Sequence, residues 1–326
     1  MSRQQRRAFD AELRLHPQPT GQLPVERMRE GFAAFMSNFP IPDGVRQTPT
    51  ELGTRPAVLV EPAEPVGGAA QTGTILYFHG GSFSLGSPQT AMVLTAHLVK
   101  RTGVRALSLD YRLAPEHPFP AAIEDCVAAY SDLLDNGHDP DGVAFAGDSA
   151  GGGLTVTTCL AARDAGLPMP AALLAFSPGL DHTHTGASMI TKDGVDPFFT
   201  PAGLARNGAM YLDGQDPYQP LLAPAVLADL TGFPPILLQV GTNELLLDDA
   251  VRLADRARDA DVDVILDVVA DVPHVFPAYV GALDEAGQAL DRAALFLTQH
   301  LPLDRRHADG QADGQQTGMQ LTTEPR

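Results

Sequence analysis

Residues 143–153 read VAFAGDSAGGG, a short apolar run that leads into a glycine-flanked serine, Ser149. The apolar run predicts a buried strand, and the residues after the serine favour a helix that continues to about Arg163. The pattern Gly147-x-Ser149-x-Gly151 is typical of a nucleophile held on a tight turn between a strand and a helix. The two glycines let the backbone close, and the helix N-terminus places partial positive charge beside a developing oxyanion.

On either side of this segment, short apolar runs alternate with longer helical stretches. Continuous apolar runs indicate strands buried on both faces, as in a mainly parallel sheet with helices on each side, so the predicted fold class is α/β. The predicted strands are Ala57–Val60, Thr74–Phe78, Ala106–Asp110, Val143–Ala146, Ala171–Phe176, Ile236–Val240 and Val264–Val269. The other predicted helices are 24–39, 89–102, 121–136 and 278–300.

Two segments interrupt the alternation and predict a cap on the sheet. Residues 1–45 contain an amphipathic helix from Pro24 to Phe39, preceded by about twenty polar residues that we expect to be mobile or loosely helical. Residues 181–223 lack a clear strand and are rich in proline. We expect these two segments to cover a catalytic core of residues 46–180 and 224–303. Residues 304–326 offer little to bury, so we expect a disordered tail.

Composition argues against several classes of function. The chain has 326 residues, 44% of them hydrophobic, which is enough for a large core and excludes wholesale disorder. Its 22 Lys and Arg against 40 Asp and Glu give a formal charge of −18, which argues against binding nucleic acid or anionic membranes. No apolar run has the length of a signal peptide or a membrane span, so we expect a cytoplasmic protein. Two cysteines cannot form a disulfide framework.

A second glycine motif lies upstream of the serine, where residues 75–83 read ILYFHGGSF. Gly80 and Gly81 directly follow a predicted strand, and their backbone N–H groups can hold the negative oxygen of a tetrahedral intermediate. An ordinary Gly-Gly turn is the alternative interpretation. The position directly after the predicted strand Thr74–Phe78 favours an oxyanion loop.

An activated serine needs a base and an acid that orients the base, in the chain order Ser, acid, His. His274 follows a predicted strand and precedes the last helix, which is where a base is expected. Glu244 directly follows the strand that ends at Val240, and we select it as the acid, with Asp248 as the alternative. Asp248 and Asp249 also suit the capping of the next helix.

The pair His182 and His184 lies in the predicted cap. Two histidines at this spacing can contribute to a metal site, but the sequence offers no further ligands near them. We interpret both as solvated polar residues and expect no metal ion.

Five motifs in order resemble those of the hormone-sensitive-lipase-like family of bacterial esterases, a branch of the α/β-hydrolases. They are HGGSF at 79–83, DYRLAPEHPFPAA at 110–122, GDSAGG at 147–152, GTNELLLDD at 241–249 and PHVF at 273–276. The resemblance extends from about residue 25 to residue 300. It implies an eight-stranded, mostly parallel sheet under a helical cap.

The resemblance also implies roles for individual residues. Ser149 would be the nucleophile, His274 the base and Glu244 its acid partner, with no cofactor. The oxyanion donors would be backbone N–H groups of the loop at Gly80, Gly81 and Ser82, together with Ala150. Two positions depart from the family pattern. Many relatives have Gly in place of Ser82, and most have Asp in place of Glu244, although members that resemble monoterpene ε-lactone hydrolases use Glu.

The implied activity is that of a serine carboxylesterase that hydrolyses short- to medium-chain esters through an acyl-enzyme. A lactone hydrolase with the same triad is the alternative, and an amidase or arylformamidase is less favoured. A non-catalytic ligand-binding relative is also less favoured, because such relatives lose the base whereas His274 is present. The expected partner is a small ester or lactone, and the resemblance suggests a homodimer. Candidate pocket residues, which core packing would explain equally well, are Phe83, Asp148, Phe198, Phe199, Met210, Tyr211 and Val275.

Overall fold

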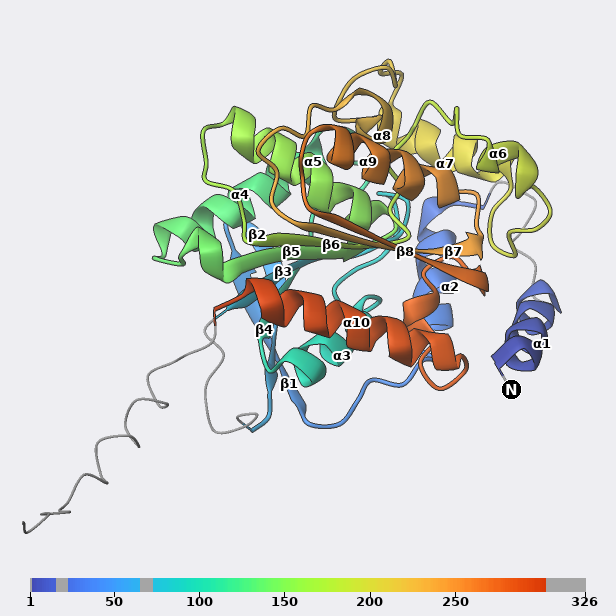
Figure 1. Cartoon of the computed structure of the whole chain (residues 1–326), viewed down its shortest axis with the longest axis horizontal. Helices are drawn as coiled ribbons and strands as arrows, with labels where there is room; N and C mark the ends of the chain where they lie inside the picture. Colours follow the sequence, from blue (N-terminus) through green and yellow to red (C-terminus); the bar gives the residue numbers. More distant parts are fainter. Residues whose placement is uncertain (1, 16–22, 65–72, 303–326) are drawn as a thin grey trace, which may run out of the picture.

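The structure is a computed structural model that describes residues 2–15, 23–64 and 73–302. An eight-stranded sheet in the order β1-β2-β4-β3-β5-β6-β7-β8 crosses its centre (Figure 1). The strands are β1 (Val45–Leu52), β2 (Arg55–Pro62), β3 (Thr74–Phe78), β4 (Arg105–Leu109), β5 (Val143–Asp148), β6 (Ala172–Phe176), β7 (Ile236–Asn243) and β8 (Val264–Pro273). Strands β3 to β8 pair in parallel, whereas β1 and β2 are antiparallel to their neighbours. The predicted α/β class and the mostly parallel sheet are confirmed.

The central parallel strands are buried on both faces, as is typical of a parallel sheet covered by helices. Every residue of β3, β5 and β6 is buried, as their continuous apolar sequences require. Strand β5 lies between β3 and β6, so its carboxyl end opens at the middle of the sheet. Ligand sites of open parallel sheets lie at such carboxyl ends.

Helices cover both faces of the sheet (Figure 1). One layer contains α3 (Met92–Thr102) and α10 (Asp284–His300), and the other contains α4 (Ala121–Asp135), α5 (Ala150–Asp164) and α9 (Leu247–Asp259). Each layer packs on its own hydrophobic cluster, with alternate strand residues contributing to each. Ile75 and Tyr77 belong to the α3–α10 cluster, whereas Leu76 and Phe78 belong to the other.

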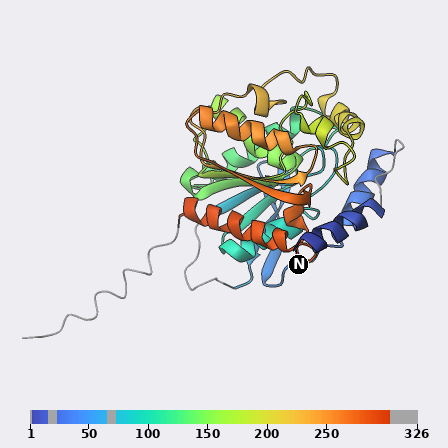
Figure 2. The same ribbon diagram turned by 45° about the vertical axis from the view of Figure 1, so that its right-hand side comes forward.

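The helices of the predicted cap lie together at the end of the sheet to which the strand arrows point (Figure 1). They are α2 (Val25–Met36), α6 (Ser188–Thr191) and α7 (Pro201–Leu212), and α8 (Pro224–Leu227) leads back toward β7. Helix α1 (Ser2–Leu15) lies outside this group (Figure 2), with the Phe9 ring 4.9 Å from that of Tyr279. None of the helices in the described ranges is both long and apolar enough to cross a bilayer.

Three elements differ from the sequence prediction. Strand β1 was not predicted because its sequence, VRQTPTEL, is polar and mostly exposed; it is held by its hairpin with β2. Helix α1 is regular, since it buries Phe9 and Leu13. The last helix begins at Asp284 rather than Ala278, because Phe276–Ala278 forms a separate 3-10 turn. The tail expected at 304–326 lies outside the described residues.

Candidate active site

Ser149 occupies the turn between β5 and α5 with a φ of 55° and a ψ of −118°. This backbone conformation is uncommon for a residue with a side chain and is typical of a strained functional turn. Close approach explains the two flanking glycines. A Cβ on Gly151 would lie 2.0 Å from the carbonyl oxygen of Phe78, and one on Gly147 would lie 2.4 Å from that of Gly151. The turn therefore accepts only glycine at both positions.

Ser149, Glu244 and His274 each directly follow a strand, β5, β7 and β8 respectively, and their side chains meet. The Oγ of Ser149 lies 2.9 Å from Nε2 of His274. The other ring nitrogen of His274, Nδ1, lies 2.8 Å from Oε2 of Glu244. The structure thus brings the three predicted residues into one hydrogen-bonded chain, in which a serine contacts a base and the base contacts a carboxylate.

A residue that the sequence analysis missed, Ser177, supports this chain. Glu244 is fully buried, and its Oε1 accepts hydrogen bonds from the Ser177 hydroxyl, at 2.8 Å, and from the backbone N–H of Gly241. The Ser177 Oγ in turn accepts the N–H of Val275 at 2.9 Å. Ser177 therefore ties the acid to the loop that carries His274. Ser177 lies just after β6 with a φ of 45°, and no pattern in the sequence indicates this conformation.

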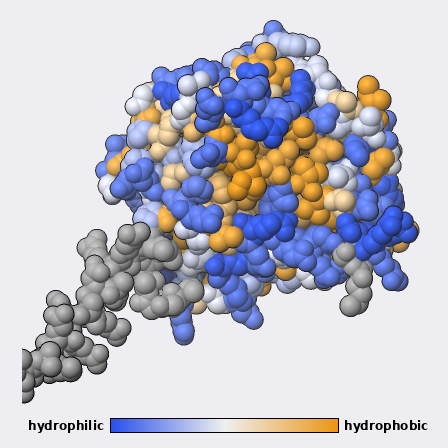
Figure 3. Space-filling view, viewed as in Figure 1, coloured by the Kyte–Doolittle hydropathy of each residue, from blue (hydrophilic) through white to orange (hydrophobic). Residues whose placement is uncertain are grey.

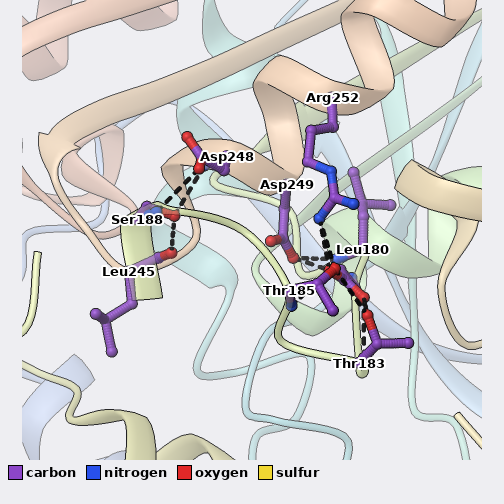
Figure 4. Close-up of polar contacts among 9 residues, drawn as sticks. Leu180, Thr183, Thr185, Ser188, Leu245, Asp248, Asp249 and Arg252 are labelled. Atoms are coloured by element: carbon purple, nitrogen blue, oxygen red, sulfur yellow. Dashed lines mark hydrogen bonds and ion pairs between the residues drawn. The ribbon is translucent and has the colours of Figure 1, made fainter. Parts of the chain in front are cut away.

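The alternative acid, Asp248, faces another part of the molecule. Its Oδ2 accepts the N–H of Ser188 at 2.9 Å, whereas the neighbouring Asp249 accepts the N–H groups of Leu180 and Asp181 (Figure 4). Neither carboxylate contacts His274. The expectation that both residues cap α9 is also wrong, because that helix has no side-chain cap. Both instead hold the segment that follows β6.

The surroundings of His274 set its basicity. Burial alone lowers the pKa of the imidazole, but the hydrogen bond and charge of Glu244 raise it, and the charges of Asp196 and Asp148 add to this effect. The net pKa of His274 lies above the ordinary value of 6.5. A raised pKa favours the imidazolium that forms when the ring takes a proton from Ser149.

The loop after β3 lies beside the serine in a left-handed backbone conformation, with φ values of 124° at Gly81, 53° at Ser82 and 59° at Phe83. Among the described residues, no acceptor takes the N–H of Gly81 or Ser82. The N–H of Gly80 differs, because it donates to Asp148 Oδ1 at 3.1 Å. Gly80 is therefore corrected from a candidate oxyanion donor to an anchor of the loop.

Asp148 holds this loop rather than lining a pocket. Its Oδ1 also accepts the hydroxyl of Tyr77 at 2.8 Å. Burial raises the pKa of Asp148 to about 6, although the donors Tyr77 and Gly80 oppose the rise. The residue beside the serine thus fixes the start of the loop.

Comparisons with known proteins agree with this arrangement. A family profile described as the α/β hydrolase fold matches residues 75–278. A solved esterase from the bacterial hormone-sensitive lipase family superposes with a TM-score of 0.86 at 38% identity, over 92% of this chain and 99% of that one. The chain belongs to the hormone-sensitive-lipase family of α/β-hydrolase esterases.

Two curated relatives of this esterase have related descriptions. An acetyl-hydrolase from Streptomyces hygroscopicus is 46% identical over 236 residues, which cover 72% of this chain and 79% of the relative. An esterase from Acinetobacter venetianus is 36% identical over 231 residues, which cover 71% of this chain and 76% of the relative.

Two further residues of the esterase, both missed in the sequence, join α2 and the segment before α7 to the loops beside Ser149. Arg29 of α2 donates through Nε to the carbonyl oxygen of Ser84, at 2.9 Å, and through Nη2 to that of Ala114, at 3.0 Å. Its Nη2 also lies 2.6 Å from the carboxylate of Glu116. Because Ser84 belongs to the loop after β3, Arg29 fixes that loop from the cap side.

The second residue, Asp196, lies between α6 and α7 and is buried. Its Oδ1 accepts the N–H groups of Phe198, at 2.8 Å, and Phe199, at 3.0 Å. Its Oδ2 accepts the N–H of Leu245, directly after Glu244, at 2.9 Å. The segment before α7 is thereby bonded to the loop that carries Glu244.

A cavity of about 50 Å³ opens beside Ser149. Of the candidate pocket residues, Phe83 and Phe199 line it, and the Phe199 ring lies 5.0 Å from that of His274. Asp148, Phe198, Met210, Tyr211 and Val275 are not part of the wall. Tyr211 instead stacks on Phe83 at 3.9 Å from within the core. His182 and His184, interpreted from sequence as solvated, do line the cavity.

Proposed function

We propose that this esterase hydrolyses carboxylic esters with short chains through an acyl-enzyme on Ser149. The observation that carries the proposal is the unbroken chain of hydrogen bonds from Glu244 through His274 to Ser149. In this mechanism His274 takes the proton from the Ser149 hydroxyl as Oγ attacks the acyl carbon. It then gives that proton to the leaving alcohol.

Glu244 keeps the proton of the neutral ring on Nδ1, so that Nε2 is free to act as the base. The negative oxygen of the tetrahedral intermediate is held by the N–H groups of Gly81, Ser82 and Ala150. Two facts support these donors: the first two N–H groups have no acceptor among the described residues, and Ala150 begins helix α5. Water activated by the same histidine then releases the acid and regenerates Ser149.

The size of the cavity supports a short acyl or alkyl group. A cavity of about 50 Å³ accommodates only a few heavy atoms, which favours acetate to butyrate over medium chains. The acetyl-hydrolase among the relatives supports the same range. In this proposal residues 1–45 and 181–223 act as the cap domain, and α7 limits the cavity because it contributes Leu204, Asn207 and Gly208 to the wall.

The test is a hydrolysis panel of p-nitrophenyl esters from acetate to laurate, together with γ-butyrolactone and ε-caprolactone. We expect the highest kcat/KM at acetate to butyrate and the loss of all hydrolysis in Ser149→Ala. Faster turnover of the lactones than of any open-chain ester would replace the esterase proposal by lactone hydrolysis on the same triad. Retained hydrolysis in Ser149→Ala would refute the mechanism.

We also propose a homodimer that forms through β8, the edge strand of the sheet. Figure 3 shows a continuous hydrophobic area on the face that carries β8 in Figure 1. Ile265 and Val268 of β8 are 53% and 43% exposed, and Leu295 of α10 is 59% exposed. An apolar edge strand is a favourable site for pairing with a second copy. In analytical ultracentrifugation we expect the wild type to sediment as a dimer and Val268→Lys to sediment as a monomer. A monomeric wild type would refute this proposal.

A further inference from the structure

The wall of the cavity beside Ser149 combines apolar residues with polar side chains, and besides Ser82, Ser149 and Asp181 these polar groups come from His182, His184, Asn207 and Asp249. Among the described residues, nothing accepts from or donates to either imidazole ring or the Asn207 amide. Small-molecule sites have this composition, in which an apolar wall binds and a few polar groups select and orient the ligand.

Asp249 adds a buried polar atom that lacks a partner. Its Oδ2 accepts the N–H groups of Leu180, at 2.7 Å, and Asp181, at 3.0 Å. Figure 4 shows the other carboxyl oxygen turned away from these two donors. That oxygen, Oδ1, is buried and has no hydrogen-bond partner. A buried polar atom without a partner destabilises the protein unless a ligand or water satisfies it.

Burial favours the uncharged forms of His182, His184 and Asp249 in this wall. Burial lowers the pKa of His182 to about 4 and also lowers that of His184. Burial raises the pKa of Asp249 well above its ordinary value, which favours the protonated carboxyl, although the N–H groups of Leu180 and Asp181 that bond Oδ2 oppose the rise. The wall therefore offers neutral donors and acceptors.

The nearest charges are engaged with each other. Asp181 also lines the cavity, but its carboxylate pairs with Arg252 at 2.9 Å and accepts hydrogen bonds from Thr183 and Thr185 (Figure 4). An ionic ligand would thus meet no free counter-ion among the described residues of this wall. A plain alkyl chain would leave the neutral polar groups unsatisfied.

We propose that this cavity selects esters that carry an uncharged polar substituent, such as an ether, hydroxyl or amide group, within a few atoms of the ester carbonyl. The inference rests on the proposed function and specifies its substrate class. Asn207 and His182 determine the specificity by hydrogen bonding to that substituent, whereas Asp249 lies buried in the same wall. The short distance follows from the small cavity, since Ser149 lies in its wall.

The test compares esters of equal size that differ by one ether oxygen. On the acyl side the pair is p-nitrophenyl methoxyacetate and p-nitrophenyl butyrate. On the alcohol side it is 2-methoxyethyl acetate and butyl acetate. For each pair we measure the ratio of kcat/KM for the ether to that for the alkyl ester, in the wild type and in variants. Intrinsic reactivity cancels in the change of this ratio.

Asn207→Leu and His182→Phe remove polar atoms, and the phenylalanine keeps a ring beside Phe83 and Tyr211. We expect one of the two ratios to fall about 10-fold in both variants, as the loss of a hydrogen bond predicts. Arg206→Leu is the matched control, since Arg206 is an exposed neighbour on α7 outside the wall, and it should keep both ratios.

The inference is overturned if neither ratio changes by more than about twofold in Asn207→Leu or in His182→Phe. The inference is also overturned if Arg206→Leu lowers either ratio as much as Asn207→Leu and His182→Phe do. Both outcomes leave the esterase proposal intact, because that depends on Ser149→Ala and the chain-length panel. If Ser149→Ala loses activity on every ester while the ratios in Asn207→Leu and His182→Phe stay unchanged, the esterase proposal holds and the specificity inference fails.

Discussion

The guanidinium of Arg29 lies 2.9 Å from the carbonyl oxygen of Ser84 and so joins helix α2 to the loop that follows β3. These residues are 55 positions apart in the chain. The contact means that an N-terminal helix without a fully buried residue is fixed to the loop proposed to bind the oxyanion. The helix is thus expected to affect turnover as well as access to the cavity.

Replacing Arg29 by methionine should lower kcat about 10-fold with a smaller change in KM, because oxyanion donors act mainly in the transition state. Arg27→Met is the matched control, since Arg27 lies on the same helix and pairs only with the exposed Glu30, and it should be nearly neutral. Steady-state kinetics with p-nitrophenyl butyrate measures both. Equal effects of the two substitutions would exclude a positioning role for Arg29.

The choice between the two acids is tested by Glu244→Gln and Asp248→Asn. Loss of the acid that orients the base lowers kcat by about 10⁴ in a serine protease, and we expect a fall of about 10³ to 10⁴ in Glu244→Gln. Asp248→Asn should reduce kcat by less than about 10-fold, since its carboxylate bonds Ser188 rather than the histidine. A larger loss in Asp248→Asn would contradict the proposed acid.

The pH profile of kcat/KM should report the raised pKa of His274. The neutral ring is the active form, so activity falls as the pH decreases through that pKa, and the acid limb should lie above 6.5, the ordinary value for histidine. Asp196 contributes to the rise through its charge. Asp196→Asn should therefore move the limb to lower pH.

The control for this shift is Asp193→Asn, an exposed acid three residues earlier in the same loop, which should leave the limb in place. An acid limb at the same pH in Asp196→Asn and in the wild type would show that the charge of Asp196 does not raise the pKa of His274.

Ser177→Ala should destabilise the protein by about 1–3 kcal/mol, because it leaves the buried N–H of Val275 without an acceptor and removes a donor to Glu244. Ser84→Ala is the matched control. The Ser84 hydroxyl is also buried but has no hydrogen-bond partner, so its removal should cost little. Thermal unfolding measures both, and equal shifts in Tm would contradict the bridging role of Ser177.

The sequence was sufficient to predict features that depend on local patterns. Ser149 and Glu244 were found because each follows an apolar strand, and parallel strands bring their carboxyl ends to one edge of the sheet. His274 was found in the same way. Strand β1 was not predicted, because its polar residues become a strand only through pairing with β2.

The supporting residues were not predictable, because their partners lie far away in the chain. Arg29 contacts a loop 55 residues later, and Asp196 contacts Leu245 49 residues later. No periodicity or spacing in either segment indicates these contacts. The place of His182 and His184 in the cavity wall was not predictable for the same reason, since only the folding of α7 and the segment after β6 brings them there.

The hydrogen bond from Gly80 to Asp148 has a mechanical consequence. Asp148 directly precedes Ser149 in the chain and also accepts the N–H of Gly80. The position of Asp148 therefore sets both the position of the Ser149 hydroxyl and that of the loop proposed to bind the oxyanion. A substitution that tilts β5 would move the Ser149 hydroxyl and this loop together. The distance between them would then change less than the position of either one in the molecule. Substitutions that tilt the strand are therefore expected to affect the chemistry less than substitutions that break this hydrogen bond.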